Sequence, residues 1–322
     1  MGAIDSKDAC ALPQASLALD IGGTKIAGAV VALEGGAQPR IVTRKTVPTE
    51  AARGGEAVLA TVVALAQELA DAAEEELAGI GVSSAGRIDA HDGSIAYANE
   101  IMPGWTRQPV GAALEDACGI PAAVLNDVQA HALGEARWGA GRGARTCVVV
   151  AAGTGLGGGI IAHGSIVRGH HGFAGEIGST PNPLGSAALG IGEGIADLEA
   201  VAAGSGIEAC YRALTGKALS GAEISQAANE GEEDARSIIR QAGYALGVSL
   251  AGWTNMLDPD LIILSGSVAK AGTLWRSEVE RGFAERISPV QSQLPIVDAE
   301  LGGDAPLIGA TEFLLDMLAT KR

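Results

Sequence analysis

Several short stretches of this 322-residue sequence combine glycines with side chains that could act on a phosphorylated ligand. The first is "DIGGTK", from Asp20 to Lys25, which follows an apolar run and places bare backbone N–H groups at a turn. Such turns bind phosphate oxygens, Thr24 adds a hydroxyl and Lys25 a cation, and Asp20 could orient Mg²⁺ and a terminal phosphate. An ordinary hairpin with a Gly-Gly turn would carry the same residues, so this stretch alone leaves both interpretations open.

A second stretch, "GTGLGGG", contains the spacing G-x-G-x-x-G at Gly153, Gly155 and Gly158. That spacing is typical of dinucleotide-binding proteins when a helix begins at the third glycine. Here the following residues, "GIIAHGSIVRG", are β-rich, and no helix is expected. The pattern therefore favours a phosphate-binding hairpin with Thr154 as a hydroxyl donor, and a nucleotide-dependent oxidoreductase is the less favoured alternative.

Three acidic residues could bind a hydroxyl-bearing substrate or accept a proton from it. Asp127 follows Asn126 in "LND", where a strand is expected to end and a helix to begin, which is a common place for a site in an α/β fold. There Asn126 could bind a sugar hydroxyl and Asp127 could accept its proton, although Asp127 could also be a helix N-cap. Glu176 lies between glycines in "FAGEIG", and Glu199 could equally be an exposed helical residue.

The elements that must position these residues alternate between strands and helices. The hydrophobic patterns predict strands in 16–33, 41–49, 77–86, 122–127, 146–169 and 261–268, and helices in 56–77, 109–119, 128–139, 232–257, 272–285 and 306–320, with an irregular segment at 170–206. A strand–glycine turn–strand unit begins at residue 16 and again at residue 146.

This repetition predicts two related α/β lobes with mixed sheets and a cleft between them. We expect a leader at 1–15, a small lobe at 16–125 that the C-terminal helix 306–322 completes, and a large lobe at 126–305.

The composition excludes several classes of function. The 22 basic and 38 acidic side chains give a net charge of −16, which argues against a nucleic-acid partner. The four cysteines have no C-x-x-C spacing, which predicts a cytoplasmic protein without a disulfide framework. No 18-residue apolar run, G-x-S-x-G elbow or H-E-x-x-H motif occurs, so we expect no membrane span, serine hydrolase or zinc protease.

Together, "DIGGTK", "LND", "GTGLGGG" and "GEIG" in this order resemble the ROK family (repressors, open reading frames and sugar kinases). The resemblance runs from about Leu17 to the C-terminus. It implies the two-lobed actin/hexokinase-like (ribonuclease H-like) fold. Repressor members of the family carry an N-terminal helix-turn-helix, and the residues before the first motif are too few for one.

The resemblance also implies a role for each matching residue. Asp127 matches the catalytic base. The other matching residues are those of the first phosphate motif (Asp20, Gly22, Gly23, Thr24, Lys25), the second phosphate motif (Gly153, Thr154, Gly155), the adenosine-side turn (Gly266) and the sugar side (Gly86, Arg87, Asn99, Asn126, Glu176, Glu199).

One departure from the family concerns zinc. The family usually reads G-E-I-G-H, and its histidine binds zinc and sugar, whereas this sequence has Ser179 there. The family's C-x-C-G-x-x-G-C cluster falls on Gly190, Gly192 and Asp197. We therefore expect no zinc site, and a loop at 180–196 that is ordered by packing or by substrate.

The reaction that the resemblance implies is transfer of the γ-phosphoryl group of ATP to the 6-hydroxyl of a hexose or N-acylhexosamine, with Mg²⁺. Glucose and N-acetylmannosamine are the expected acceptors, and "GVSSAGRID" is similar to N-acetylmannosamine kinases. The resemblance also implies a homodimer. Polyphosphate remains open as the donor, and a catalytically inactive sugar-binding sensor of the same fold is the alternative function.

Overall fold

A computed structural model describes residues 14–34, 37–185 and 197–320 of the chain. Their contacts divide the chain into two compact units. Unit 1 runs to Ala130 and resumes at Pro306, and unit 2 is His131–Ala305. The boundaries fall inside α3 (Asp127–Trp138) and at the first residue of α9 (Ala305–Thr320).

Unit 1 is built on a mixed sheet with the strand order β3-β2-β1-β4-β7. The first three strands pair antiparallel through hairpins, whereas β4 and β7 run parallel to β1. Consequently β1, β4 and β7 end at the same edge of the sheet. The strands of unit 1, including the small β5–β6 pair, are β1 (Ala15–Ile21), β2 (Lys25–Ala32), β3 (Arg40–Pro48), β4 (Leu77–Ser84), β5 (Arg87–Ile88), β6 (Ile95–Tyr97) and β7 (Ala122–Asn126).

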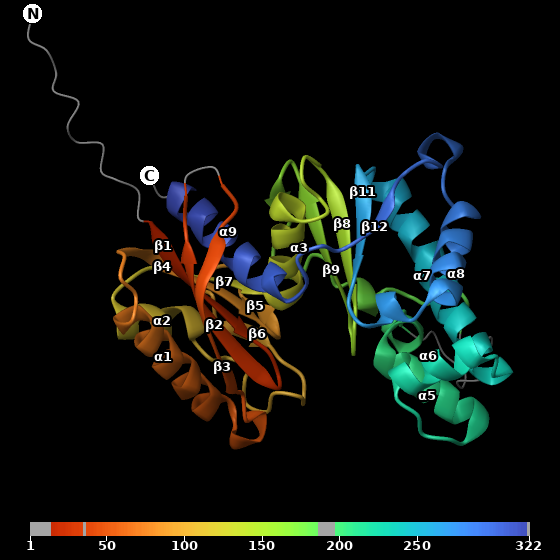
Figure 1. The fold of residues 1–322 in the computed structure, drawn as a ribbon, viewed down its shortest axis with the longest axis horizontal. Coiled ribbons are helices and arrows are strands. Elements are labelled where there is room, and N and C mark those ends of the chain that lie inside the picture. Colours follow the sequence, from red (N-terminus) through yellow and green to blue (C-terminus); the bar gives the residue numbers. More distant parts are fainter. Residues whose placement is uncertain (1–13, 35–36, 186–196, 321–322) are drawn as a thin grey trace, which may run out of the picture. The chain divides into compact units, whose positions relative to one another are not determined.

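Helices cover both faces of this sheet (Figure 1). On one face, Leu17 and Leu19 of β1 pack in a cluster with residues of α1 (Gly55–Asp71) and α2 (Val110–Cys118). On the other face, Ala18 packs in a cluster with Leu307 of α9. Because both faces are covered, every residue of β1 except Asp20 is buried, and buried and exposed positions do not alternate. A 3₁₀ turn, η1 (Ala51–Arg53), precedes α1.

Unit 2 repeats the same topology. Its sheet has the order β10-β9-β8-β11-β12, again with an antiparallel meander on one side and two parallel strands on the other. The elements of unit 2 that follow α3 are β8 (Cys147–Ala152), β9 (Leu156–Ala162), β10 (Ser165–Ile166), η2 (Ile177–Ser179), α4 (Glu199–Ala202), α5 (Gly204–Thr215), α6 (Gly221–Glu230), α7 (Glu233–Leu257), β11 (Leu261–Ser265), η4 (Val268–Lys270), α8 (Thr273–Ala284), η5 (Pro289–Gln291), β12 (Ile296–Asp298) and η6 (Gly302–Asp304).

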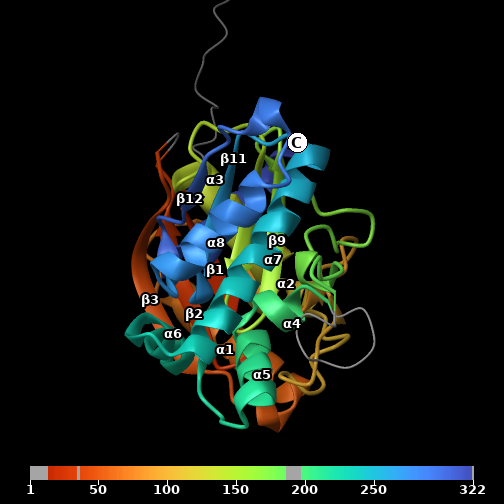
Figure 2. The same cartoon turned by 90° about the vertical axis from the view of Figure 1, so that its right-hand side faces the viewer.

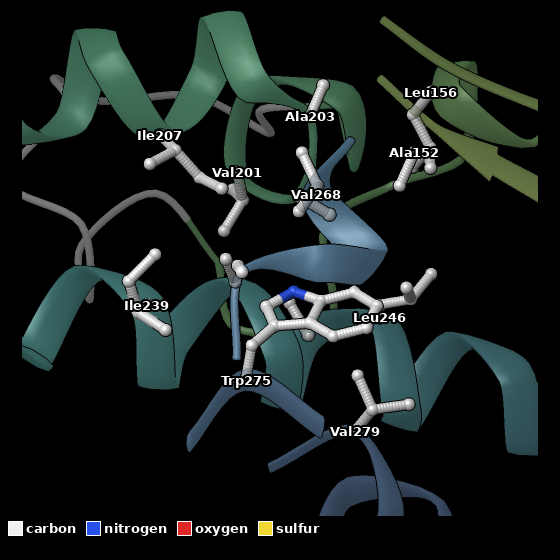
Figure 3. Packing of buried hydrophobic residues seen from close by; sticks show 14 of the residues in the cluster. Ala152, Leu156, Val201, Ala203, Ile207, Ile239, Leu246, Val268, Trp275 and Val279 are labelled. Atoms are coloured by element: carbon white, nitrogen blue, oxygen red, sulfur yellow. The ribbon is translucent and has the colours of Figure 1, made fainter. Parts of the chain in front are cut away.

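The core of unit 2 lies between this sheet and α7, which packs against α8 along its length (Figure 2). Trp275 of α8 is fully buried, and Figure 3 shows its indole beside Leu246 and Val279. With aromatics at only 3% of the chain, most of this core is Ala, Val, Leu and Ile. Ile207 of α5 and Val268 of η4 belong to the same cluster. The core of unit 2 therefore also packs against α5 and η4.

The repeated strand–turn–strand openings predicted at residues 16 and 146 are confirmed by the two hairpins β1–β2 and β8–β9. The prediction of an irregular segment at 170–206 is wrong at its C-terminal end, where α4 and the start of α5 form. The sequence patterns did not predict the rest of α5, α6 or β12. The start of α6 carries a capping box, in which Ser220 and Glu223 each accept a backbone N–H of the other residue, and this signal would have located the helix.

Two further findings concern the cysteines and the helices that could span a membrane. Cys118, Cys147 and Cys210 have free thiols, and Cys10 lies outside the described residues. In the part of the chain that the structure describes, no helix combines the length and the apolarity needed to cross a membrane.

Candidate active site

The polar residues predicted in unit 1 gather at the edge where its parallel strands end. In the strand register, Asp20 of β1 lies opposite Ser83 of β4, and Ser84 lies opposite Asn126 of β7. The hydroxyl of Ser83 donates a 2.6 Å hydrogen bond to Oδ1 of Asp20. Ligands of α/β folds bind at such carboxyl edges, so the topology makes this edge a candidate site.

The "DIGGTK" turn connects β1 to β2 and is held from outside by Thr49. The backbone N–H of Gly22 donates to the carbonyl of Lys25 at 3.0 Å, and the hydroxyl of Thr49 donates to the carbonyl of Gly22 at 2.6 Å. A Cβ at Gly23 would lie 2.8 Å from the Ile101 side chain, so the turn has little room for a larger residue. Thr24 and Lys25 are exposed beyond it.

Asp127 is the first residue of α3, and Asn126 supplies the helix cap. Oδ1 of Asn126 accepts the backbone N–H groups of Val128 at 3.0 Å and Gln129 at 3.2 Å. Its Nδ2 donates to the carbonyl of Gly86 and to Oδ1 of Asp127, each at 2.9 Å. The alternative in which Asp127 is the N-cap is therefore wrong, because Asn126 performs that task.

Burial shifts the pKa values of both acidic residues at this edge. The pKa of Asp127 is raised to about 6, because burial, aided by the neighbouring Asp20 carboxylate, outweighs the lowering effect of the hydrogen bonds from the Val128 N–H and from Asn126. Burial also raises the pKa of Asp20, opposed by the Ser83 hydrogen bond and by the charges of Lys25 and Arg44. A carboxyl group poised near neutrality is suited to accept a proton.

The predicted sugar-side residues of unit 1 lie on two neighbouring segments. Gly86 has φ 95°, and a Cβ there would lie 2.8 Å from the carbonyl oxygen of Tyr97, so this turn requires glycine. The guanidinium of Arg87 stacks over the Tyr97 ring, 5.2 Å from its centroid. Asn99 is exposed, and its Oδ1 accepts the backbone N–H of Ile101 at 3.1 Å. Gly86 is thus linked to Asn126, whereas Asn99 stabilises its own turn.

In unit 2, the "GTG" turn joins β8 to β9 and receives the first turn of α5. The backbone N–H of Gly204 donates to the carbonyl of Gly153 at 2.8 Å. The N–H and the hydroxyl of Ser205 both donate to the carbonyl of Thr154, at 3.1 and 2.8 Å. The chain continues into β9 instead of a helix, which contradicts the context that a dinucleotide fingerprint requires.

Glu199 holds the same turn from the other side. Its Oε2 accepts the backbone N–H of Leu156 at 2.7 Å and would lie 2.8 Å from a Cβ at Gly155. The residue is exposed at the start of α4, as the simpler interpretation predicted, but its carboxylate has a definite partner. Glu199 therefore positions the glycine turn, whatever else it binds.

The glycines around Glu176 let two backbones touch. A Cβ at Gly175 would lie 2.2 Å from the carbonyl oxygen of Gly158, and a Cβ at Gly178 would lie 2.3 Å from that of Leu156. Gly178 would also approach the Glu199 side chain at 3.3 Å. The segment from Glu176 to Ser179 thus packs on β9 beside Glu199, and both Glu176 and Ser179 are exposed there.

Gly266 brings the end of β11 over the end of β8. Its φ is 95°, and a Cβ would lie 2.2 Å from the carbonyl oxygen of Ala152. Only glycine fits such an approach. The predicted adenosine-side turn and the Gly153 turn are therefore neighbours within unit 2.

A cavity of about 740 Å³ opens beside the Gly153 turn. Gly153 and Thr154 line one part of it, and α5, α6 and η4 supply the rest, with Ile207 and Val268 among its apolar residues. Glu208, Ser220 and Lys270 also line it, and none of them was predicted from the sequence. No motif marked them, because a cavity wall made by three separate elements has no fixed spacing in the sequence.

The acidic residues of the site suit Mg²⁺ bound together with phosphates. In the described ranges, no group of three or more His, Cys, Asp and Glu side chains could hold a metal ion by itself. Mg²⁺ usually keeps several waters and takes one or two carboxylates besides substrate phosphates, and the carboxylate of Asp20 fits that pattern. Gly190 and Gly192, onto which the zinc cluster of the family falls, and the loop 186–196 lie outside the described residues.

Comparison with known proteins places these features in one family. Residues 16–317 match the family described as "ROK family". The chain is 32% identical to a glucokinase of Halalkalibacterium halodurans, over 90% of this chain and 92% of that protein.

Solved structures share the fold. The structure of a ROK hexokinase from Thermus thermophilus has a TM-score of 0.82 at 29% identity, over 95% of this chain and 99% of that one. A ROK family glucokinase from Streptomyces griseus, in complex with glucose and AMPPNP, has a TM-score of 0.73 at 28% identity, over 92% of this chain and 98% of that one. The predicted two-lobed α/β fold of the actin/hexokinase-like class, with mixed sheets, is thereby confirmed.

Proposed function

The chain belongs to the ROK family and is a sugar kinase, and we propose that it transfers the γ-phosphoryl group of ATP to the 6-hydroxyl of a hexose or N-acylhexosamine. Glucose and N-acetylmannosamine are the acceptors that we infer. The first is the ligand of the Streptomyces griseus glucokinase, and the second follows from the resemblance of "GVSSAGRID" to N-acetylmannosamine kinases.

The proposal rests mainly on the position and the raised pKa of the Asp127 carboxylate. It lies at the carboxyl edge of parallel strands, close enough to Asp20 for the two charges to interact, and burial raises its pKa to about 6. At pH 7 it is mostly ionised yet basic enough to accept the proton of a sugar hydroxyl as the new P–O bond forms. General bases of this kind contribute about 10²–10⁴-fold to a rate.

Two glycine turns bind the triphosphate in this proposal. Phosphoryl transfer depends on positioning and on neutralising charge more than on covalent chemistry. The turn from Gly22 to Lys25 supplies backbone N–H groups, a hydroxyl and a cation, and the turn from Gly153 to Gly155 supplies backbone N–H groups and the Thr154 hydroxyl. When bound, Mg²⁺ neutralises phosphate charge, and Asp20 is the residue that would hold it.

The sugar is oriented by hydrogen-bonding residues from both units. Asn126, Asn99, Gly86 and Arg87 belong to unit 1, and Glu176 and Glu199 belong to unit 2. Carboxylates accept hydrogen bonds from hydroxyl groups, so the two glutamates suit a polyol.

The charges of the 740 Å³ cavity favour a nucleotide over polyphosphate as the donor. Its charged lining residues are Glu208, Glu230 and Lys270, so two carboxylates face a single cation. A polyanion in this space would be repelled, whereas a neutral nucleoside is not. The inactive-sensor alternative is not favoured either, because both Asp20 and Asp127 are present at the strand edge.

A coupled assay of ADP release with a panel of sugars tests the proposal. We expect ATP- and Mg²⁺-dependent turnover with glucose, N-acetylmannosamine or a close relative, and a 6-phosphate product by ³¹P NMR. Replacing ATP with polyphosphate should give no sugar 6-phosphate by ³¹P NMR, which detects the product whichever donor is used. Absence of turnover with every sugar, in protein that binds ADP, would refute the kinase assignment and favour the sensor.

A further inference from the structure

The cavity of unit 2 has a polar residue whose role the proposed reaction leaves open. Glu208 lies on α5, one helical turn after Gly204, and its side chain lines the cavity that begins at Gly153 and Thr154. Another part of the lining comes from Ser220 and from α6, which begins at Gly221. Ile207, the neighbour of Glu208, belongs to the buried core drawn in Figure 3, so this turn of α5 is anchored from below.

The carboxylate of Glu208 is held in position by one hydrogen bond, and its second oxygen can still accept another. Its Oε1 accepts the backbone N–H of Gly221, the first residue of α6, at 2.8 Å. The side chain is half-buried, and it forms no ion pair with any residue in the described parts of the chain. An ionised carboxylate only accepts hydrogen bonds. The remaining oxygen, Oε2, therefore suits a ligand group that donates one, such as a hydroxyl.

Charge and distance determine which part of a nucleotide meets Glu208. Phosphates are repelled by the carboxylate, so they belong at the other end, beside the backbone of Gly153 and Thr154. The backbone N–H of Gly204 donates a hydrogen bond to the Gly153 carbonyl, so Gly204 lies beside the proposed phosphate turn. Glu208 follows four residues later, which corresponds to about 6 Å along the helix. In a nucleotide, the group that follows the phosphates at about this distance is the ribose, which carries two hydroxyl donors.

We propose that Glu208 is a specificity-determining residue for the phosphoryl donor, because its Oε2 accepts a hydrogen bond from the ribose diol and thereby selects ribonucleotides over deoxyribonucleotides. This inference rests on the proposed function, since it assumes that the cavity holds a nucleotide. A hydrogen bond to a charged group contributes about 1.5–3 kcal/mol. Losing it corresponds to about tenfold or more in affinity.

Calorimetric titration with ADP, 2′-deoxyADP and 3′-deoxyADP tests the inference without turnover. Wild-type protein should bind at least one deoxy analogue about tenfold more weakly than ADP. In Glu208→Gln, ADP should weaken to the level of that analogue, whose own affinity should not change. The glutamine oxygen can still accept the Gly221 N–H, so this variant should fold, and its thermal unfolding should match that of wild type.

A matched variant, Glu280→Gln, removes a charge from the exposed surface of α8 and should keep the wild-type preference. The inference is overturned if wild type binds all three nucleotides equally, or if Glu208→Gln weakens all three by the same factor. Those outcomes leave the kinase proposal standing. If wild type binds no ADP at all, the proposed nucleotide site is wrong, and with it the role of Glu208.

Discussion

Asn126 donates a 2.9 Å hydrogen bond from its side-chain nitrogen to the carboxylate of Asp127, the residue that follows it. The same side chain caps α3 and bonds to the Gly86 carbonyl. A single amide thus fixes the helix that begins with Asp127, tethers a predicted sugar-side turn and stabilises the charged form of the proposed base. These three tasks explain why Asn and Asp are adjacent here.

Asn126→Ala should therefore change both the pH dependence of the enzyme and its stability. Removing the hydrogen bond that lowers the pKa of Asp127 moves the acid limb of the kcat/KM profile from about pH 6 to a higher pH. Loss of the helix cap should lower the stability by about 1 kcal/mol. Asn255→Ala, which removes hydrogen bonds to Arg286 and Ser288 in unit 2, should leave the limb in place. An unshifted limb in Asn126→Ala contradicts the proposed link.

Asp127→Asn should raise the stability of the protein at alkaline pH. The pKa of Asp127 lies near 6 in the folded state against 3.8 ordinarily, so the folded protein binds this proton more tightly than the unfolded chain. The carboxyl group costs stability as pH rises from about 4 to 6, by at most about 3 kcal/mol, and the cost persists above pH 6. Thermal unfolding without nucleotide should show a gain that is largest at pH 8 and small near pH 4.

A surface residue supplies a control of opposite sign. Hydrogen bonds from Ser94 lower the pKa of Asp92, so its ionised form stabilises the fold above its ordinary pKa. Asp92→Asn should lower the unfolding temperature at pH 8 and have little effect at low pH. If Asp127→Asn lowers the unfolding temperature at pH 8 as well, burial does not dominate the environment of Asp127.

Gly266→Ala should disturb unit 2 strongly. The new Cβ would lie 2.2 Å from the Ala152 carbonyl oxygen, on a backbone with φ 95°. Overpacking and the left-handed backbone together cost about 2–4 kcal/mol, and ADP affinity should fall with the displaced turn. Gly252→Ala is the matched control, because nothing lies within 4 Å of its Cβ inside α7. That variant should gain about 0.5–1 kcal/mol. Similar unfolding temperatures for the two variants would exclude the close-approach argument.

The sequence pointed to the proposed phosphate turns and the proposed base because their signals are local. Asp20 with its glycines and Asp127 at a strand–helix junction each lie within a few consecutive residues. The capping role of Asn126 was missed because Asn and Asp have similar cap preferences, and only the geometry distinguishes them. The cavity beside the Gly153 turn was missed because Glu208, Ser220 and Lys270 come from separate parts of the chain, which only the packing of unit 2 brings together.

Substitutions at Glu199 separate its structural role from its proposed sugar contact. Glu199→Gln keeps an oxygen that can accept the Leu156 N–H, whereas Glu199→Ala leaves that N–H without its partner. We expect the glutamine variant to unfold like wild type but to show a KM for the sugar that is raised about tenfold. The alanine variant should lose stability as well. A wild-type KM in Glu199→Gln would mean that the residue only holds the turn.

The central claim is that the Asp127 carboxylate accepts the proton of the sugar hydroxyl. Its most direct test is the kcat of Asp127→Asn, measured with saturating ATP and sugar in protein whose ADP affinity is determined in parallel. We expect kcat to fall by about 10²–10⁴-fold while ADP affinity stays within about twofold. Turnover close to wild type in that variant would contradict the claim.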